Sequence, residues 1–367
     1  MQTDVVTGAF GYSGAAIARE LRAAGHQVRT LTGHPRAQTD RDRPGAGDID
    51  TRPLDFGDPE ALVNDLTGAH TLYCTYWVRF PHGQSTRESA VTNSKVLFDA
   101  AARAGVERIV YISILHADAG SPYPYFSGKA EVERHLAATG MPYAIARPSI
   151  LFGSSDGLGS AASVLVNNIA WLLRHLPVFG VGDGGGYRIR PIEVDDLARL
   201  CVELGGRPDN VTVDAVGPDA PTFRELVAAI RTATGSRALL VPAPGWLIPP
   251  LAAALGAALR DVLLTTEEYR AMADGLATSD APSTGQASLM DWIAAHGGEL
   301  GRTYANELDR HYRPARLAPG PPFRPGPSEV RRATCQYGRW HGSHVTGYSS
   351  QLIGVQCALG RAFKCLG

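Results

Sequence analysis

Lysine is scarce in this chain. Of the 367 residues, 35 are lysine or arginine, but only Lys95, Lys129 and Lys364 are lysines. The basic residues form no long run, and the formal net charge is −1. This balance argues against nucleic acid as a partner, because a nucleic-acid-binding surface needs clustered positive charge. The scarcity also draws attention to any lysine that falls within a motif.

Closely spaced cysteines are also missing, and no internal repeat is visible. The five cysteines are Cys74, Cys201, Cys335, Cys357 and Cys365. An odd number without close spacing does not form a disulfide framework, and a chain of this length can build its core without one. His341 and His344 lie between two of these cysteines, but the intervals match no common zinc finger. We therefore expect no metal site.

No apolar run is long enough to span a bilayer. The most apolar stretch, WLIPPLAAALGAAL (246–259), is too short and contains Pro249-Pro250. We expect it to form a buried helix rather than a helix that lies on a membrane surface. No basic-then-apolar leader precedes DVVTG at the start of the sequence. These features predict a cytoplasmic protein without a membrane span.

Short apolar runs alternate with amphipathic segments through the first two thirds of the chain. This alternation predicts an α/β Rossmann fold, with a doubly wound parallel sheet and a smaller, mostly helical substrate lobe. We expect a Rossmann core at 1–217 and a substrate lobe at 218–313. Within the core, residues 153–193 are expected to contribute to the substrate side. The proline-rich segment 314–367 is expected to be a linker and weakly ordered tail. The strands are expected at 4–8, 26–31, 70–76, 108–113, 143–152 and 210–217, and the helices at 13–24, 59–66, 89–105, 129–140, 160–176 and 194–206.

Three glycines follow the first expected strand in TGAFGYSG (7–14). Gly8 would permit a tight turn, Gly11 would let the backbone approach a pyrophosphate, and Gly14 would let the helix pack on the strand. The free N–H groups of that helix would face the phosphates. A second match, GVGDGG (180–185), leads into an extended segment instead of a helix and predicts only a turn.

The end of the second strand bears on coenzyme choice. NAD-specific sites usually place an acidic residue there to hold the ribose hydroxyls. Here the chain reads Thr32-Gly33-His34-Pro35-Arg36, without an acid. Arg36 or His34 would attract a 2′-phosphate, so the sequence favours NADP(H) over NAD(H).

Tyr125 and Lys129 are four residues apart in SPYPYFSGKAEVE, just after the expected strand RIVYIS (108–113). On a helix they share one face. A phenol is a poor base at neutral pH, but a nearby ammonium and an oxidised nicotinamide favour the phenolate. Tyr125 would then exchange a proton with a substrate carbonyl or hydroxyl while hydride moves to or from the coenzyme.

These segments resemble the extended or atypical short-chain dehydrogenase/reductase superfamily, near its NmrA-like and NAD-dependent epimerase/dehydratase-like branches. The resemblance covers about residues 1–313 and rests on TGAFGYSG, PLDFGD (53–58), Asn93, RIVYIS, YFSGK (125–129), RPSILFG (147–153) and PIEVDDLARL (191–200). It implies proton transfer by Tyr125, and ribose binding with pKa lowering by Lys129. It also implies a coenzyme site made of Thr7, Gly8, Phe10, Gly11, Tyr12, Gly14, Thr32, Arg36, Asp55, Thr75, Lys129 and Pro148.

One position departs from the superfamily pattern. A serine or threonine usually follows the strand that carries RIVYIS and bonds the substrate oxygen. Ser113 is the candidate here, but it stands one position early and is followed by Ile114, Leu115 and His116. His116 is an alternative partner for the substrate.

Three other functions stay open. GSSDG (153–157) fits the nucleophile elbow of a hydrolase with Ser155 as nucleophile, Asp195 or Asp196 as acid and His296 as base, but it leaves the glycines and the Tyr-Lys pair unexplained. An NmrA-like protein would bind the dinucleotide as a redox sensor or assembly subunit without turnover. A nucleotide-sugar epimerase or dehydratase uses the same scaffold. The expected partners are a small-molecule substrate and a second copy in a homodimer.

Overall fold

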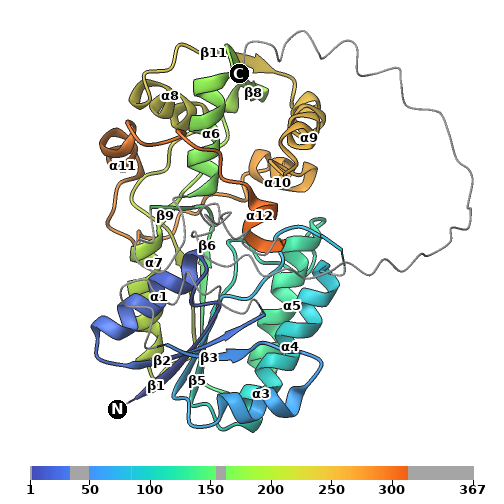
Figure 1. Ribbon diagram of the computed structural model, residues 1–367, viewed down its shortest axis with the longest axis vertical. Coiled ribbons are helices and arrows are strands. Elements are labelled where there is room, and N and C mark those ends of the chain that lie inside the picture. The colour runs from blue at the N-terminus through green and yellow to red at the C-terminus, as the bar shows by residue number, and fades with distance from the viewer. Residues whose placement is uncertain (1, 34–48, 84, 154–162, 313–367) are drawn as a thin grey trace, which may run out of the picture. The chain divides into compact units, whose positions relative to one another are not determined.

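The computed structural model describes residues 2–33, 49–83, 85–153 and 163–312. These residues belong to one compact unit that spans residues 1–316. Its centre is a seven-stranded sheet in the order β10-β6-β5-β4-β1-β2-β3, in which every pair is parallel (Figure 1). The strands are β1 (Thr3–Thr7), β2 (Gln27–Thr32), β3 (Asp50–Pro53), β4 (Thr71–Cys74), β5 (Arg108–Ile112), β6 (Tyr143–Pro148) and β10 (Val211–Ala215).

Successive strand residues face opposite sides of the sheet and enter two separate cores. Val6, with neighbours on the other strands, packs beneath α1 and α7. Val5 packs on the opposite face beneath α3, α4 and α5. The covering helices are α1 (Tyr12–Ala23) and α7 (Val194–Gly205) on one face, and α3 (Pro59–Leu66), α4 (Arg87–Arg103) and α5 (Pro124–Ala138) on the other. The sequence therefore predicted the α/β Rossmann class correctly, because strands buried on both faces read as continuous apolar runs.

A third core lies in the lobe, around Phe152, Ile189 and Ile293. Two small parallel sheets accompany it: β7 pairs with β9, and β8 pairs with β11. The lobe elements are β7 (Leu151–Phe152), α6 (Val164–His175), β8 (Val178–Gly182), η1 (Asp183–Gly185), β9 (Ile192–Glu193), α8 (Phe223–Ala233), β11 (Leu239–Ala243), η2 (Gly245–Leu247), α9 (Ile248–Leu259), α10 (Thr266–Ala273), α11 (Leu289–His296) and α12 (Glu307–Tyr312). Among the described residues, no helix is both long and apolar enough to cross a membrane.

Several expectations need correction. Strands β3, β8 and β11 were not expected, because each is short and mostly exposed or half-buried along its length. The expected strand 143–152 is two strands, β6 and β7, which pair with different partners. Helix α5 begins at Pro124 rather than 129, since proline is favoured in the first turn. The turn expected at 180–185 is confirmed as the end of β8 followed by η1.

The expectation for 246–259 is wrong. The segment does form a helix, α9, but Gly256 is its only buried residue. Trp246, just before the helix, has 76% of its surface exposed, and Leu251 has 52%. Periodicity alone could not reveal this, because a uniformly apolar helix is typical of burial.

Asp196 ties the lobe to the parallel sheet. It is buried at the start of α7, and its Oδ2 accepts 2.8 Å hydrogen bonds from the backbone N–H groups of Gln286 and Ala287. Its Oδ1 pairs with Arg199. A buried carboxylate is tolerated only with such partners, so this residue fixes the loop before α11.

We expect Asp196→Ala to lower the free energy of unfolding by about 2–4 kcal/mol, because it leaves two backbone donors without their buried acceptor and removes the partner of half-exposed Arg199. The neighbouring Asp195 is the control. Its ion pair with Arg19 is one-third exposed at both ends, so Asp195→Ala should cost at most about 1 kcal/mol. Chemical denaturation of both variants measures the difference, and equal losses would contradict the anchoring role.

Candidate active site

The glycine turn lies at the carboxyl end of β1, where the strand order reverses between β1 and β4. Gly8 has φ +65° and donates a 2.9 Å hydrogen bond to the Leu31 carbonyl. A Cβ on Gly14 would lie within 2.8 Å of the Gly8 carbonyl carbon and nearer still to its oxygen. Both positions therefore require glycine, as the sequence predicted.

The same turn presents the start of α1 to the sheet edge. Gly11 precedes the helix as its N-cap and supplies no side-chain cap. Helix geometry leaves the first-turn N–H groups without intrahelical acceptors and places positive charge there. A switch point, a bare glycine turn and a helix N-terminus together fit the pyrophosphate of a dinucleotide. The residues present therefore fit the predicted coenzyme.

Thr7 and Thr75 fasten the two strands at this switch point. Thr7 Oγ1 accepts a 2.8 Å hydrogen bond from the Thr75 N–H, and the Thr75 hydroxyl donates a 2.6 Å bond to the Thr7 carbonyl. Thr7 is buried and Thr75 half-buried. Their side chains are engaged in joining the ends of β1 and β4. Any contact between Thr7 and a coenzyme would therefore be made by the Thr7 backbone.

Tyr12 and Phe10 flank the turn. The Tyr12 hydroxyl donates a 2.9 Å hydrogen bond to the Gly153 carbonyl, which follows β7, while Phe10 packs at the rim of the core beneath α1. A Cβ on Gly153, where φ is +97°, would meet the Glu193 side chain. Burial raises the pKa of Glu193, and the Asp195 and Asp196 carboxylates add to the rise. Tyr12 thus joins the glycine turn to the lobe.

The other predicted coenzyme residues spread along the sheet edge. Thr32 ends β2, and its carbonyl accepts a 3.0 Å hydrogen bond from the Leu54 N–H. Asp55 is exposed beyond β3 and accepts a 2.8 Å bond from the Gly57 N–H. Pro148 is buried at the end of β6. His34 and Arg36 lie outside the described residues, as does Ser155 of the hydrolase alternative.

Lys129 is buried within the protein. Its exposed fraction is 2%, and Nζ donates a 2.7 Å hydrogen bond to the Ile112 carbonyl at the end of β5. Nζ also lies 4.3 Å from the ring centroid of Trp77 and 4.7 Å from that of Tyr111. Burial lowers the pKa of Lys129 to about 7, while Cys74 and Glu133 oppose the shift. The amine therefore exchanges protons near neutral pH.

Ser113 directly follows β5, beside the carbonyl that Lys129 binds. Its N–H donates a 2.8 Å hydrogen bond to the Ala146 carbonyl, but its buried Oγ has no partner among the described residues. The buried Tyr111 hydroxyl and Trp77 Nε1 are likewise unpartnered in that part of the chain. Unpaired buried polar atoms are costly, and here the rings of Trp77 and Tyr111 contact the Lys129 amine, while Ser113 follows the residue whose carbonyl binds it.

Tyr125 lies one helical turn before Lys129 on α5, as expected, but no hydrogen bond joins the two among the described residues. The Tyr125 ring packs edge-on to Trp77 at 5.6 Å between centroids, and the Arg87 guanidinium lies 5.9 Å from its centroid. Burial raises the pKa of Tyr125 well above its ordinary value, and Glu268 adds to this, while Arg79 and Arg87 oppose it. Lys129 is not among the groups that most shift the pKa of Tyr125 here, and the pKa lowering expected from it stays a prediction.

Sequence reasoning missed what surrounds this phenol. Glu267 of α10 accepts a 2.8 Å hydrogen bond from the Tyr125 N–H and pairs with Arg87. Arg79 pairs with Glu268 at 2.8 Å and with Glu307 at 2.9 Å. The capping box of TTEE at 265–268 was readable as a helix start, but nothing in the sequence connects it with Tyr125.

The remaining candidates are placed elsewhere. His116 has φ +55°, and its Nε2 lies 2.6 Å from the Thr278 carbonyl, so its ring is engaged with the lobe. Asn93 on α4 donates a 3.0 Å hydrogen bond to the Tyr76 hydroxyl. Within the described ranges, no group of three or more His, Cys, Asp or Glu side chains could hold a metal ion.

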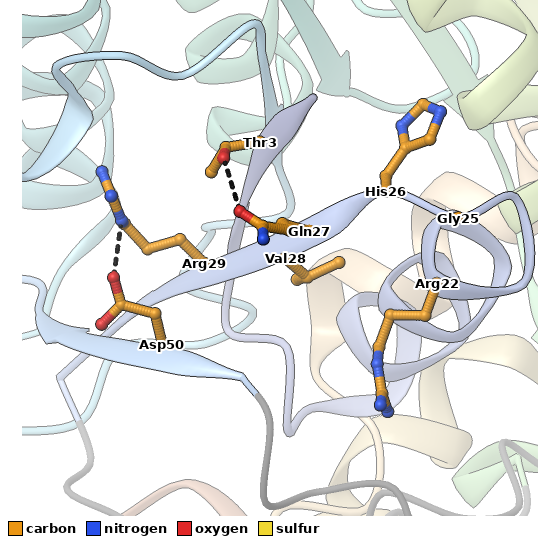
Figure 2. Close-up of a pocket in the computed structure, with 8 residues that line it drawn as sticks. All are labelled: Thr3, Arg22, Gly25, His26, Gln27, Val28, Arg29 and Asp50. Carbon is orange, nitrogen blue, oxygen red and sulfur yellow. Dashed lines mark hydrogen bonds and ion pairs between the residues drawn. The ribbon is translucent and has the colours of Figure 1, made fainter. Parts of the chain in front are cut away.

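A separate hollow lies at the amino ends of the strands, opposite the ends that carry the glycine turn (Figure 2). It is lined from the amino ends of β1, β2 and β3, where Thr3 bonds Gln27 at 3.3 Å and Arg29 pairs with Asp50 at 2.9 Å. Ligands of parallel α/β sheets bind at the carboxyl ends of the strands. We therefore assign this hollow no part in coenzyme binding.

Comparison with known proteins agrees with this geometry. Residues 8–164 match the family described as NAD(P)H-binding. The photosystem II assembly factor Ycf39 of Cyanophora paradoxa is 29% identical over 170 residues, 46% of this chain and 51% of that protein. Quinone oxidoreductase 2 of Escherichia coli (strain K12) is 26% identical over 189 residues, 52% of this chain and 60% of that protein. The matched segments thus span about half to three-fifths of these relatives.

Solved structures share the fold. Triphenylmethane reductase of Citrobacter sp., crystallised with NADP(H), superposes with a TM-score of 0.64 at 18% identity, over 81% of this chain and all of that one. The Escherichia coli quinone oxidoreductase QOR2 complexed with NADPH gives a TM-score of 0.64 at 21% identity, over 80% of this chain and 98% of that one. These likenesses confirm the architecture expected from the sequence.

We expect Gly14→Ala to lower NADPH affinity at least about tenfold and to lower the melting temperature, because its Cβ meets fixed backbone atoms of the turn. Gly206→Ala is the control, since its Cβ would lie 3.6 Å from the nearest atom, the Glu203 carbonyl oxygen. Fluorescence titration with NADPH measures affinity. Unchanged binding by Gly14→Ala would contradict the close approach.

Buried Lys129 should make stability depend on pH. The unfolded lysine holds its proton up to about pH 10.4, whereas the folded one loses it near 7, so the unfolded state binds more protons between these values. The free energy of unfolding from this group therefore rises with pH in that window, by at most about 1.4 kcal/mol per pH unit. Lys129→Met should remove this rise in denaturation measured between about pH 7.5 and 9.

The matched control is Lys95→Met. Lys95 lies at the surface of α4 and pairs with Glu131 at 2.6 Å, so its removal should leave the pH slope as in the unmodified protein. Parallel slopes for the unmodified protein and Lys129→Met would show that the amine is not buried as a neutral group.

Proposed function

We propose that the protein is an NADP(H)-dependent oxidoreductase of the short-chain dehydrogenase/reductase type, a proposal supported by the match of residues 8–164 to the NAD(P)H-binding family. It would transfer hydride between the nicotinamide and a carbonyl or secondary alcohol. The core at 1–217 would hold the coenzyme, and the lobe at 218–313 would shape the substrate site. The observation that carries this proposal is the buried amine of Lys129 beside the unpartnered hydroxyl of Ser113, at the sheet edge that carries the glycine turn.

The preference for NADP(H) rests on the missing acid after β2 and on the arginine-containing segment of the sequence that follows it. The structural neighbours crystallised with NADP(H) or NADPH support the same choice. Asp55 is too far along the chain to replace the missing acid at the end of β2, because it follows β3 instead. It would lie on the adenine side.

The direction of proton transfer follows from the surroundings of Tyr125. The phenol is protonated at neutral pH, so Tyr125 carries a proton to donate. When bound, NADPH supplies the hydride. Tyr125 would give its proton to the substrate oxygen, so the carbonyl becomes an alcohol and the phenol a phenolate. Tyr125 is thus proposed as the proton donor when a carbonyl is reduced.

Lys129 and Ser113 would complete the site. Lys129, with its pKa near 7, would hold the ribose and supply the proton that restores the phenol. The Ser113 hydroxyl would donate a hydrogen bond to the substrate oxygen and thereby satisfy its own buried oxygen atom. Arg79 and Arg87 would stabilise the phenolate by charge.

A second candidate is a coenzyme-binding sensor or assembly protein without turnover. It is favoured by the lack of a hydrogen bond between Tyr125 and Lys129 in the described part of the chain, and by the likeness to an assembly factor. An epimerase or dehydratase that acts on a nucleotide sugar is a third, supported by scaffold alone.

Titration with NADPH and NADH, followed by turnover assays on ketones, quinones and nucleotide sugars, tests these candidates. We expect tighter binding of NADPH, and we expect Tyr125→Phe to lower kcat by about 10²–10⁴-fold while NADPH affinity stays unchanged. Tyr123→Phe is the control, because that hydroxyl bonds Asp274 at the lobe surface. Equal turnover by Tyr125→Phe would remove the phenol from the mechanism, and NADPH binding without turnover would favour the sensor.

A further inference from the structure

A long stretch of the lobe carries no polar side chain other than the indole of Trp246. From 238 to 259 the chain reads ALLVPAPGWLIPPLAAALGAAL, with Arg237 before it and Arg260 after it. The stretch forms β11, η2 and α9. Its composition would suit a buried core, yet most of α9 and β11 is exposed or half-buried. An exposed apolar surface of this kind marks an interaction site.

The exposed side chains gather in one place. Among the described residues, the large apolar side chains with the greatest exposure are Val178 (46%), Leu239 (63%), Val241 (43%), Trp246 (76%) and Leu251 (52%). We call these five residues the apolar patch. They come from β8, β11 and the η2–α9 segment, which lie together at one end of the lobe (Figure 1).

The strand register places the β8 and β11 members on one face. Leu239 pairs with Val178 and Val241 with Gly180 in parallel register, so these residues point the same way from the small sheet. Phe179 and Leu240, on the opposite face, pack into the lobe core. The sheet therefore buries one face and presents the other.

Helix α9 borders this same face. Cβ atoms built on Gly180 and Gly182 would both meet the Ile248 side chain at the start of α9. Ile248 thus covers the far end of the face, and the Val178–Leu239 end stays open beside it. Leu251 follows Ile248 by one helical turn. Ile248 therefore links α9 to the face that carries Val178, Leu239 and Val241.

Two arginines flank the apolar stretch in the sequence. Arg237 and Arg260 are exposed, and neither side chain has a hydrogen bond or ion pair to another described residue. The Asp183 carboxylate accepts bonds of 2.8 Å from the Gly245 N–H and the Tyr269 hydroxyl, which hold it against the lobe. An exposed apolar stretch with an indole, flanked in the sequence by two exposed arginines, matches the interface of an anionic bilayer.

We propose that the apolar patch docks the protein onto anionic phospholipid membranes, with Trp246 and Leu251 inserted at the headgroup level and Arg237 and Arg260 on lipid phosphates. A second copy of this chain is the rival occupant. A twofold interface would bring the same patch from both copies together, whereas an anionic membrane would supply phosphates to both arginines. The proposal does not rest on the proposed function.

Vesicle flotation with the full chain tests this proposal. The full chain should float with vesicles of phosphatidylcholine and phosphatidylglycerol, and weakly with phosphatidylcholine alone. Trp246→Ser should lower the partition coefficient roughly tenfold. Arg237→Gln combined with Arg260→Gln should lower it about tenfold on anionic vesicles only. Arg103→Gln is the matched control, since Arg103 lies on α4 and pairs with exposed Glu60.

Fluorescence gives an independent readout. Trp246→Phe keeps an aromatic side chain, so it should still float but lose most of the emission shift on vesicle binding. NADPH titration should be the same for all these variants, which separates this proposal from the proposed function. Absence of flotation would overturn the proposal, as would sedimentation that shows a dimer broken by Trp246→Ser with no binding to vesicles.

Discussion

The contact between Gly14 and the Gly8 carbonyl is the constraint from which the site is built. Without a Cβ at position 14, the first turn of α1 presses against the backbone at the end of β1. This contact aims the helix N-terminus across the carboxyl ends of the strands, where the strand order reverses between β1 and β4. The threonine pair Thr7 and Thr75 then locks those strand ends together. A dinucleotide site follows from backbone shape more than from any particular side chain.

A buried cation defines the second half of the site. Lys129 gives up water for one carbonyl oxygen and two aromatic faces. Cation–π contacts recover only part of the hydration lost, so the amine is held near its neutral form. Neighbouring hydroxyls of Ser113 and Tyr111 are left without partners in the described chain. Buried hydroxyls without partners suit a site whose hydrogen bonds are completed when coenzyme and substrate bind.

Ion pairs between the core and the lobe set the environment of Tyr125. Arg79 and Arg87 come from the loop after β4 and from the start of α4, and their carboxylate partners come from α10 and α12. The Tyr125 phenol therefore lies near both cations and carboxylates, whose effects on its pKa oppose each other. Burial has the largest effect and raises the pKa. The lobe contributes directly to the chemistry of the core in this way.

The sequence by itself determined the Rossmann class, the glycine turn and the shared helical face of Tyr125 and Lys129. These are local features, since strand periodicity, backbone φ and helical spacing all act within a few residues. Only the tertiary structure decided that Lys129 faces the Ile112 carbonyl, that Trp77 contacts both members of the pair, and that Glu267 and Glu268 approach Tyr125 from more than a hundred residues away. It also decided that 246–259 lies exposed, because burial depends on what packs against a helix and not on its composition.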